Sequence, residues 1–177
     1  MIWDNWQALA TEIGLSDAQT DEMATLFRHH YGEQDRHYHN LSHIEALLRG
    51  QATWPEPWTD PQAVKLSIWF HDIIYQPQRR DNELQSARFA ERFFSTWPIS
   101  NETAQKVVAM IEATAGHKAV GLDEDGRAFL DLDLSILGSD AVTYDAYTQA
   151  IRKEYRRIPG ILYRPGRRKI LRSFLER

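Results

Sequence analysis

The sequence contains no cysteine among its 177 residues. A disulfide framework, a thiolate metal site and a cysteine nucleophile are therefore excluded, and any metal ion must take its ligands from histidine and carboxylate side chains. A long apolar run is also missing, because the most apolar stretch, residues 63–75, is too short to span a bilayer and contains charged residues. The first ten residues lack the basic start and the apolar run of a signal peptide. We therefore expect a soluble, cytoplasmic protein without a membrane partner.

Strand patterns of useful length are also absent, whereas the helical spacing of apolar residues dominates. Ser16 followed by Gln19 is a capping box, which predicts the start of a helix. Apolar periodicity and stop residues predict helices over residues 16–31, 39–49, 62–75, 82–97, 100–116, 127–137, 139–157 and 164–175. The helix over 62–75 is apolar almost all round, which indicates the centre of a bundle. No repeat or linker interrupts the chain, so we expect an all-α, single-domain helical bundle over residues 1–177.

Positive charge is concentrated near the C-terminus. The net charge is −4, yet residues 152–177 hold ten of the 21 Lys and Arg residues and only two acidic residues. A solvated helix face explains such a stretch, and a surface for an anionic partner is the alternative. No RNA-binding fingerprint is present and the isoelectric point is about 6.0, so nucleic-acid binding through this region stays a secondary interpretation. The oligomeric state is left open, a homo-oligomer included.

Two apolar segments contain aspartates that a helical bundle would bury. His71 and Asp72 lie in the middle of the first segment, and Asp131 and Asp133 lie in the second. Burial of an ionised aspartate costs on the order of several kcal/mol unless a cation or hydrogen-bond donors compensate it. A divalent ion would provide that compensation.

Histidines occur near the first of these segments in a spacing that suits metal binding. His39 and His43 are four residues apart, which would place them on one face of a helix. Together with the aspartates they would form a nitrogen and oxygen ligand set, which suits Mn, Fe, Co, Ni or Zn. Each residue also has a simpler explanation: a histidine on an apolar helix is usually a satisfied core residue, and Asp131 could cap a helix or pair with an arginine.

The order His…His-Asp…Asp on successive helices resembles the HD superfamily of metal-dependent phosphohydrolases, in particular small bacterial proteins of the predicted HD phosphohydrolase group. Residues 38–43, Tyr-His-Asn-Leu-Ser-His, are similar to the Tyr-His-Asn-x-x-His signature of the helical cyclic nucleotide phosphodiesterases. Residues 133–135, Asp-Leu-Ser, are similar to the segment that ends their metal site. Residues 81–83, Asp-Asn-Glu, and 151–155, Ile-Arg-Lys-Glu-Tyr, resemble further segments of the small bacterial group. The resemblance implies a helical bundle of the HD-domain type.

The resemblance also implies a ligand set and two catalytic residues. The implied metal ligands are His43, His71, Asp72 and Asp133. His39 matches the residue that protonates the leaving oxygen in the cyclic nucleotide enzymes, and Asp72 is the second catalytic candidate. Beyond the His-Asp pair only His117 could replace the extra histidines of two-metal members, so we expect one divalent ion (Mn, Fe, Co, Ni, Zn or Mg) rather than two. Asp131 is the alternative last ligand, since it lies about 200° round the helix from Asp133.

The implied reaction is hydrolysis of a phosphoester, with a nucleotide or a similar phosphorylated small molecule as substrate and water activated on the metal. Phosphoryl oxygens need a positively charged clamp, for which arginine is well suited because it binds phosphate through two hydrogen bonds. The candidates for substrate contact are His117, Glu83, Arg36, Lys118 and Arg167. Asp81 and Asp131 are candidates for supporting the ligands or replacing one of them. The alternative function is a non-catalytic module, a sensor or partner protein, that holds a metal and a phosphorylated ligand.

Overall fold

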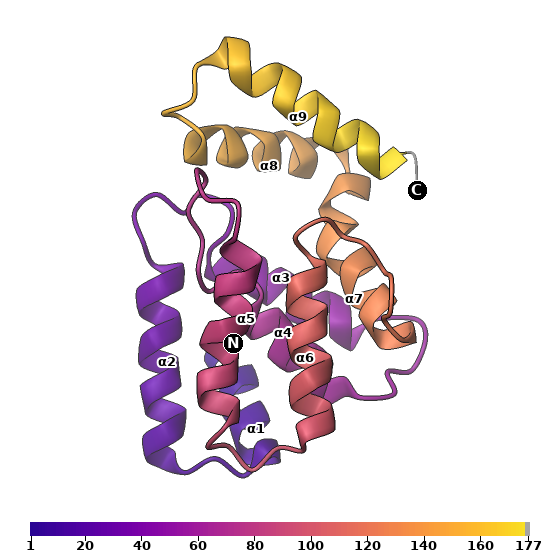
Figure 1. Cartoon of the computed structure of the whole chain (residues 1–177). Coiled ribbons are helices and arrows are strands. Elements are labelled where there is room, and N and C mark those ends of the chain that lie inside the picture. The colour runs from indigo at the N-terminus through magenta and orange to yellow at the C-terminus, as the bar shows by residue number, and fades with distance from the viewer. Residues whose placement is uncertain (176–177) are drawn as a thin grey trace.

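The computed structural model describes residues 1–175, and within them the chain is helical without a β-strand (Figure 1). The elements in chain order are α1 (Ile2–Ile13), α2 (Asp17–Tyr31), α3 (Leu41–Ala52), α4 (Pro61–Phe70), α5 (Asn82–Phe94), α6 (Asn101–Ala113), α7 (Glu124–Asp133), the 3-10 helix η1 (Leu134–Gly138), α8 (Ala141–Glu154) and α9 (Gly160–Leu175). The predicted all-α class is confirmed. No helix within the described residues combines the length and apolar character that a membrane crossing requires.

Several helices begin where a polar side chain caps the first turn. Ser16 accepts a hydrogen bond from the backbone amide of Gln19, and the side chain of Gln19 accepts one from the amide of Ser16, so the predicted capping box is confirmed. Asn40 accepts a hydrogen bond from the second residue of α3, and Asp60 accepts one from the third residue of α4. These two caps fix the starts of the helices that supply the histidines of the site.

An aromatic cluster forms the centre of the core. Trp6 of α1, Phe27 of α2 and Trp69 of α4 lie with their ring centroids between 4.7 and 5.7 Å apart. Phe70 packs edge-on against Phe27 at 5.2 Å. Seven of the ten residues of α4 are buried, as its all-round apolar sequence predicts for a central helix. The C-terminal end of α4 is therefore held inside the bundle.

This central helix ends five residues earlier than the sequence predicts, at Phe70. The reason lies in the residues that follow. In a continued helix the carbonyl of Trp69 would accept from the amide of Ile73, but it accepts from the Tyr31 hydroxyl at 2.8 Å, and the Ile73 amide bonds to the carbonyl of Phe70. The guanidinium of Arg36 donates to the carbonyls of Asp72 and Ile73, at 2.5 and 2.7 Å. His71 and Asp72 thus lie in a turn at the end of α4.

Other boundaries also differ from the sequence prediction. α3 begins at Leu41, because Asn40 caps it from an extended conformation (φ −130°, ψ −174°). His39 therefore precedes the helix, and the expectation that it shares a helix face with His43 is wrong. α7 begins at Glu124 rather than near residue 127, and α1 was not predicted at all.

α8 and α9 lie together across one end of the bundle (Figure 1). α8 buries three of its side chains, whereas α9 buries none of its own. The contacts that hold α9 include a hydrogen bond from Arg167 to the Tyr147 hydroxyl, ring contacts between Tyr163 and Tyr155 and between Phe174 and His117, and a cation–π contact between Arg152 and Tyr163. With so little buried surface, α9 is attached less firmly than the helices of the core.

Asp125, in the first turn of α7, is a buried carboxylate that joins three segments of the chain. It accepts hydrogen bonds from the backbone amides of Thr59 and Asp60, at 2.9 and 2.7 Å, and from the Lys106 ammonium at 2.7 Å. Burial raises the pKa of Asp125, but Lys106 and the two amides outweigh burial and hold this pKa below its ordinary value. The charged carboxylate therefore stabilises the fold.

We expect Asp125→Asn to lower the free energy of unfolding by about 1–3 kcal/mol at pH 7, because an amide leaves one buried donor without an acceptor. A carboxylate with a depressed pKa contributes stability above its unfolded pKa of about 3.9 and loses that contribution as the pH falls further. The difference between the two proteins should therefore shrink between pH 5 and pH 3. Urea unfolding at several pH values measures it, with Asp131→Asn, an exposed position on the same helix, as control. A difference that stays constant down to pH 3 would contradict the assignment.

Candidate metal centre

The predicted metal ligands come from three helices that pack against one another. His43 lies in the first turn of α3, His71 and Asp72 follow the end of α4, and Asp133 is the last residue of α7. α3 contacts both α4 and α7, and α4 contacts α7. Each ligand thus sits at or near a helix end, where the three helices converge.

Nitrogen and oxygen atoms of these side chains point toward a common position. His43 Nε2 lies 3.3 Å from His71 Nε2 and 3.2 Å from Asp133 Oδ1, and the His71 nitrogen lies 3.7 Å from the same oxygen. All three donor atoms lie within 4.8 Å of one another, as the ligands of a single ion would. Asp72 adds a second carboxylate, with Oδ2 at 3.0 Å from His71 Nε2 and 3.9 Å from His43 Nε2.

The orientation of His71 supports this role. Its Nδ1 lies 3.0 Å from the carbonyl oxygen of Ile68. Because a carbonyl can only accept a hydrogen bond, Nδ1 carries the proton of the neutral ring and Nε2 keeps its lone pair. That lone pair faces the cluster. A hydrogen bond on the far nitrogen is the arrangement that fixes metal-binding histidines in their productive tautomer.

The electrostatics of the cluster favour positive charge. The side chains of Asp72 and Asp133 are 14% and 12% exposed, so two carboxylates are largely removed from water. Burial lowers the pKa of His71, but Asp72 and Asp133 outweigh burial and raise it to about 9. The two Nε2 atoms only 3.3 Å apart cannot both carry a proton without repulsion. A divalent cation among these four side chains would compensate both carboxylates and accept both lone pairs, so the residues present fit such an ion.

His117 and Asp131 differ in their relation to Asp133. His117 Nε2 lies 2.9 Å from Asp133 Oδ2, which leaves Oδ1 of the carboxylate directed at His43. His117 therefore positions the Asp133 carboxylate. Asp131 is exposed and lies outside the cluster, as expected for two residues about 200° apart on one helix.

His39 lies beside the cluster and is held by Glu154, for which the sequence alone predicts no role. Its Nδ1 is 2.7 Å from Glu154 Oε2, and its Nε2 is 4.0 Å from Asp72 Oδ2. Burial lowers the pKa of His39, but Asp72 and Glu154 outweigh burial and raise it above its ordinary value. The ring also stacks on Tyr75, with centroids 4.1 Å apart. His39 is thus an oriented imidazole that favours the protonated form.

Glu154 is buried although it belongs to the basic C-terminal part of the chain. Its Oε1 accepts hydrogen bonds from the backbone amides of residues 37, 38 and 39 at 2.7 to 3.0 Å, and its Oε2 faces His39 Nδ1 and the Tyr75 hydroxyl. Burial raises the pKa of Glu154, but His39 and the backbone amides outweigh burial and lower it to about 2. The sequence signal for it was weak: one acidic residue in a basic stretch, within the Ile-Arg-Lys-Glu-Tyr segment.

Some of the other residues predicted to contact the substrate or to support the ligands lie at the site, and others lie elsewhere in the molecule. Arg36 is 6% exposed and donates to backbone carbonyls, so its guanidinium fixes the turn after α4 and is not directed at a substrate. Asp81 pairs with Arg79, away from the cluster, and Lys118 is exposed. Glu83, His117 and Arg167 line the cavity described next.

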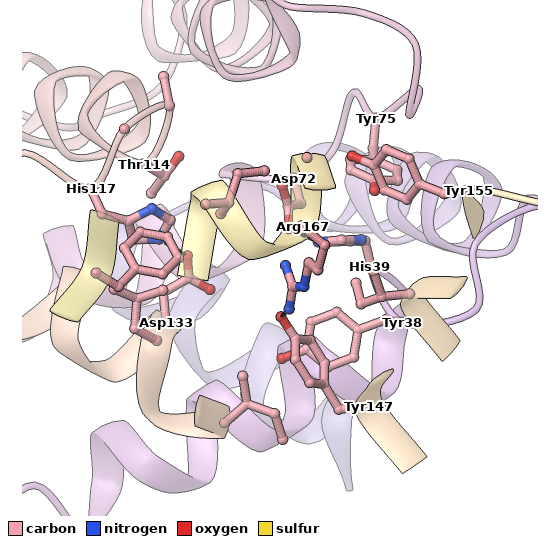
Figure 2. A pocket seen from close by; sticks show the side chains of 18 of the residues that line it. Tyr38, His39, Asp72, Tyr75, Thr114, His117, Asp133, Tyr147, Tyr155 and Arg167 are labelled. Atoms are coloured by element: carbon pink, nitrogen blue, oxygen red, sulfur yellow. Dashed lines mark hydrogen bonds and ion pairs between the residues drawn. The ribbon is translucent and has the colours of Figure 1, made fainter. Parts of the chain in front are cut away.

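A cavity of about 460 Å³ lies between the ligand cluster and α9 (Figure 2). Asp72, Asp133 and His39 line it on the side of the cluster, and α9 contributes residues from Leu162 to Phe174 on the opposite side. This volume is typical of small-molecule sites.

Comparisons of the chain with protein-family models, with curated proteins and with solved structures return no match.

Asp133→Asn should weaken binding of a divalent transition metal by more than the ~10–100-fold that loss of a residue supporting a ligand typically costs. A neutral amide replaces a charged ligand in this variant. Asp131→Asn makes the same chemical change two residues away and should leave the affinity unaltered, because this side chain is exposed. Metal content after dialysis and calorimetric titration with Mn or Co measure both variants. Equal affinity of Asp133→Asn and the unaltered protein would overturn the assignment.

Proposed function

We propose that the protein is a metal-dependent phosphohydrolase of the HD type that hydrolyses a phosphoester, with a nucleotide or a similar phosphorylated small molecule as substrate. One observation supports this function above others. Asp72 and Asp133 of the ligand cluster and the imidazole of His39 line the same cavity. Hydrolysis needs these two elements together, an activated water on one side of the phosphorus and a proton donor on the other.

A divalent ion in the cluster would lower the pKa of water toward ~7 and so make hydroxide available at neutral pH. The residues of the chain supply the rest. Asp72 lies between the cluster and His39, with its Oδ2 3.0 Å from His71 Nε2 and 4.0 Å from His39 Nε2. It can therefore accept the proton that the attacking water loses and, through one intervening water, return a proton to His39 after the reaction.

His39 is the proton donor in this mechanism. The carboxylate of Glu154 can only accept a hydrogen bond, so His39 Nδ1 carries one proton of the imidazolium and donates it to Glu154. The second proton is on Nε2, which faces the cavity side. As the bond from phosphorus to the ester oxygen breaks, Nε2 transfers this proton to the departing oxygen. The new bond from phosphorus to the water oxygen completes the hydrolysis, and a phosphate and an alcohol leave.

The alternative, a non-catalytic module that holds a metal and a phosphorylated ligand, uses only part of this arrangement. Such a module has no need of an imidazole that a buried carboxylate orients and whose protonated form that carboxylate favours. The His39–Glu154 pair, 2.7 Å long and stacked on Tyr75, therefore favours hydrolysis. A cavity of about 460 Å³ also suits a small molecule better than a nucleic-acid strand.

We expect His39→Ala to retain the metal and to lower kcat by ~10²–10⁴-fold for an alkyl phosphoester. The loss should be much smaller for 4-nitrophenyl phosphate, because nitrophenolate departs without a proton. Steady-state kinetics with both substrate types, together with metal analysis, test this expectation.

His37→Ala is the matched control, since His37 is an exposed histidine two residues earlier. Loss of the metal from His39→Ala would show that His39 is a ligand and not an acid. An equal loss of kcat for both types of substrate would also contradict the role of proton donor.

A further inference from the structure

Arg167 is a cation inside the cavity without a carboxylate partner among the described residues. The inner face of α9 carries it, and Figure 2 shows its side chain directed into the cavity that Asp72, His39 and Asp133 also line. The guanidinium donates to the hydroxyl of Tyr147 and lies 5.1 Å from the centre of that ring. Neither contact neutralises its charge.

The neighbouring cations of α9 differ from Arg167 in their surroundings. Arg164 and Arg168 are exposed and do not line this cavity, whereas Arg167 is half-buried. An arginine has five N–H donors in a planar arrangement, and the hydroxyl of Tyr147 accepts from one nitrogen only. Donors therefore remain for a planar or tetrahedral oxyanion, which arginine binds through two parallel hydrogen bonds.

Apart from the ligand cluster, His39 and Arg167, most of the cavity wall is aromatic or apolar, and its remaining polar side chains are Glu83, Thr114, His117 and Ser173. Six leucine and isoleucine side chains line it together with the tyrosines Tyr38, Tyr75, Tyr147, Tyr155 and Tyr163. Such a wall suits a flat aromatic or apolar body, while Arg167 and a metal ion held by the ligand cluster would bind an anionic group. The volume limits the ligand to a small molecule.

We propose that Arg167 is the oxyanion-binding residue of this site and that the ligand is the phosphate monoester of a compact aromatic or apolar alcohol. The proposal rests on the proposed hydrolytic function and names its substrate class. The oxyanion lies between the ligand cluster and the guanidinium, and the organic body lies against the tyrosines. Because α9 buries none of its own residues in the protein core, the bound anion also adds to the attachment of α9.

The test uses the full-length, metal-loaded protein and phenylphosphonate, which resembles such a monoester but cannot be hydrolysed at a P–O ester bond. Calorimetry compares the unaltered protein with Arg167→Gln, Arg167→Lys and the control Arg168→Gln, which removes the same charge from the adjacent, exposed position. We expect Arg167→Gln to weaken binding by ~10–100-fold, as loss of a charged hydrogen-bond donor does, with partial recovery in Arg167→Lys. Arg168→Gln should bind as the unaltered protein does.

Inorganic phosphate provides the second arm. It should bind more weakly than phenylphosphonate, because it makes no contact with the apolar wall. The affinity for phosphate should also fall in Arg167→Gln. Equal affinity for phosphate and phenylphosphonate would contradict the proposal that the ligand carries an aromatic or apolar group. Equal losses in Arg167→Gln and Arg168→Gln would overturn a specific role for Arg167, because general attraction to a basic helix would then suffice.

Kinetics with 4-nitrophenyl phosphate separate this proposal from the hydrolytic function. If the KM of Arg167→Gln rises in parallel with its loss of affinity for phenylphosphonate, both the role of Arg167 and the hydrolytic function are supported. If the unaltered protein hydrolyses the ester and Arg167→Gln shows the same KM and affinity, the role of Arg167 is wrong and the hydrolytic function stands. If phenylphosphonate binding depends on Arg167 but no phosphoester is hydrolysed, the oxyanion site stands and the substrate assignment falls with the hydrolytic function.

Discussion

The rest of this structure depends on one constraint. Two carboxylates, of Asp72 and Asp133, and two imidazoles, of His43 and His71, converge where helices α3, α4 and α7 meet. Asp72 and Asp133 are largely shielded from water, and each lies within 4.0 Å of an imidazole nitrogen. Separately, each buried carboxylate would oppose folding; together they create a position that favours a cation. The surrounding contacts serve the same arrangement, since the Ile68 carbonyl fixes the ring of His71 and His117 holds the second oxygen of Asp133.

Glu154 connects this centre to the C-terminal helices. One carboxylate accepts hydrogen bonds from three consecutive backbone amides, from His39 and from Tyr75. These contacts attach α8 to the segment that precedes α3, although more than 110 residues separate the two along the chain. They orient the imidazole and, by anchoring α8, they also determine where α9 lies over the cavity.

The cavity has two chemically different sides. Asp72 and Asp133, with the histidines beside them, form an acidic side that suits a cation, and Arg167 on α9 provides a positive charge opposite. An anion that also contacts a metal ion fits between such sides, because its oxygens meet positive charge in both directions. A site of this kind requires that α9 be in place, and α9 is the one α-helix within residues 1–175 that buries none of its own side chains.

Much of the helical architecture was predictable because it depends on local properties of the sequence. The capping box of Ser16, the all-round apolar character of α4 and the placement of a His-Asp pair in an apolar segment are all visible in the sequence. The 200° separation of Asp131 and Asp133 already implied that one ion could use only one of them. The partnership of Glu154 with His39, the burial of Arg36 against backbone carbonyls and the inward direction of Arg167 were decided by the tertiary structure alone. Sequence periodicity specifies the faces of a helix but not which face meets which neighbour, since that depends on contacts between segments far apart in the chain.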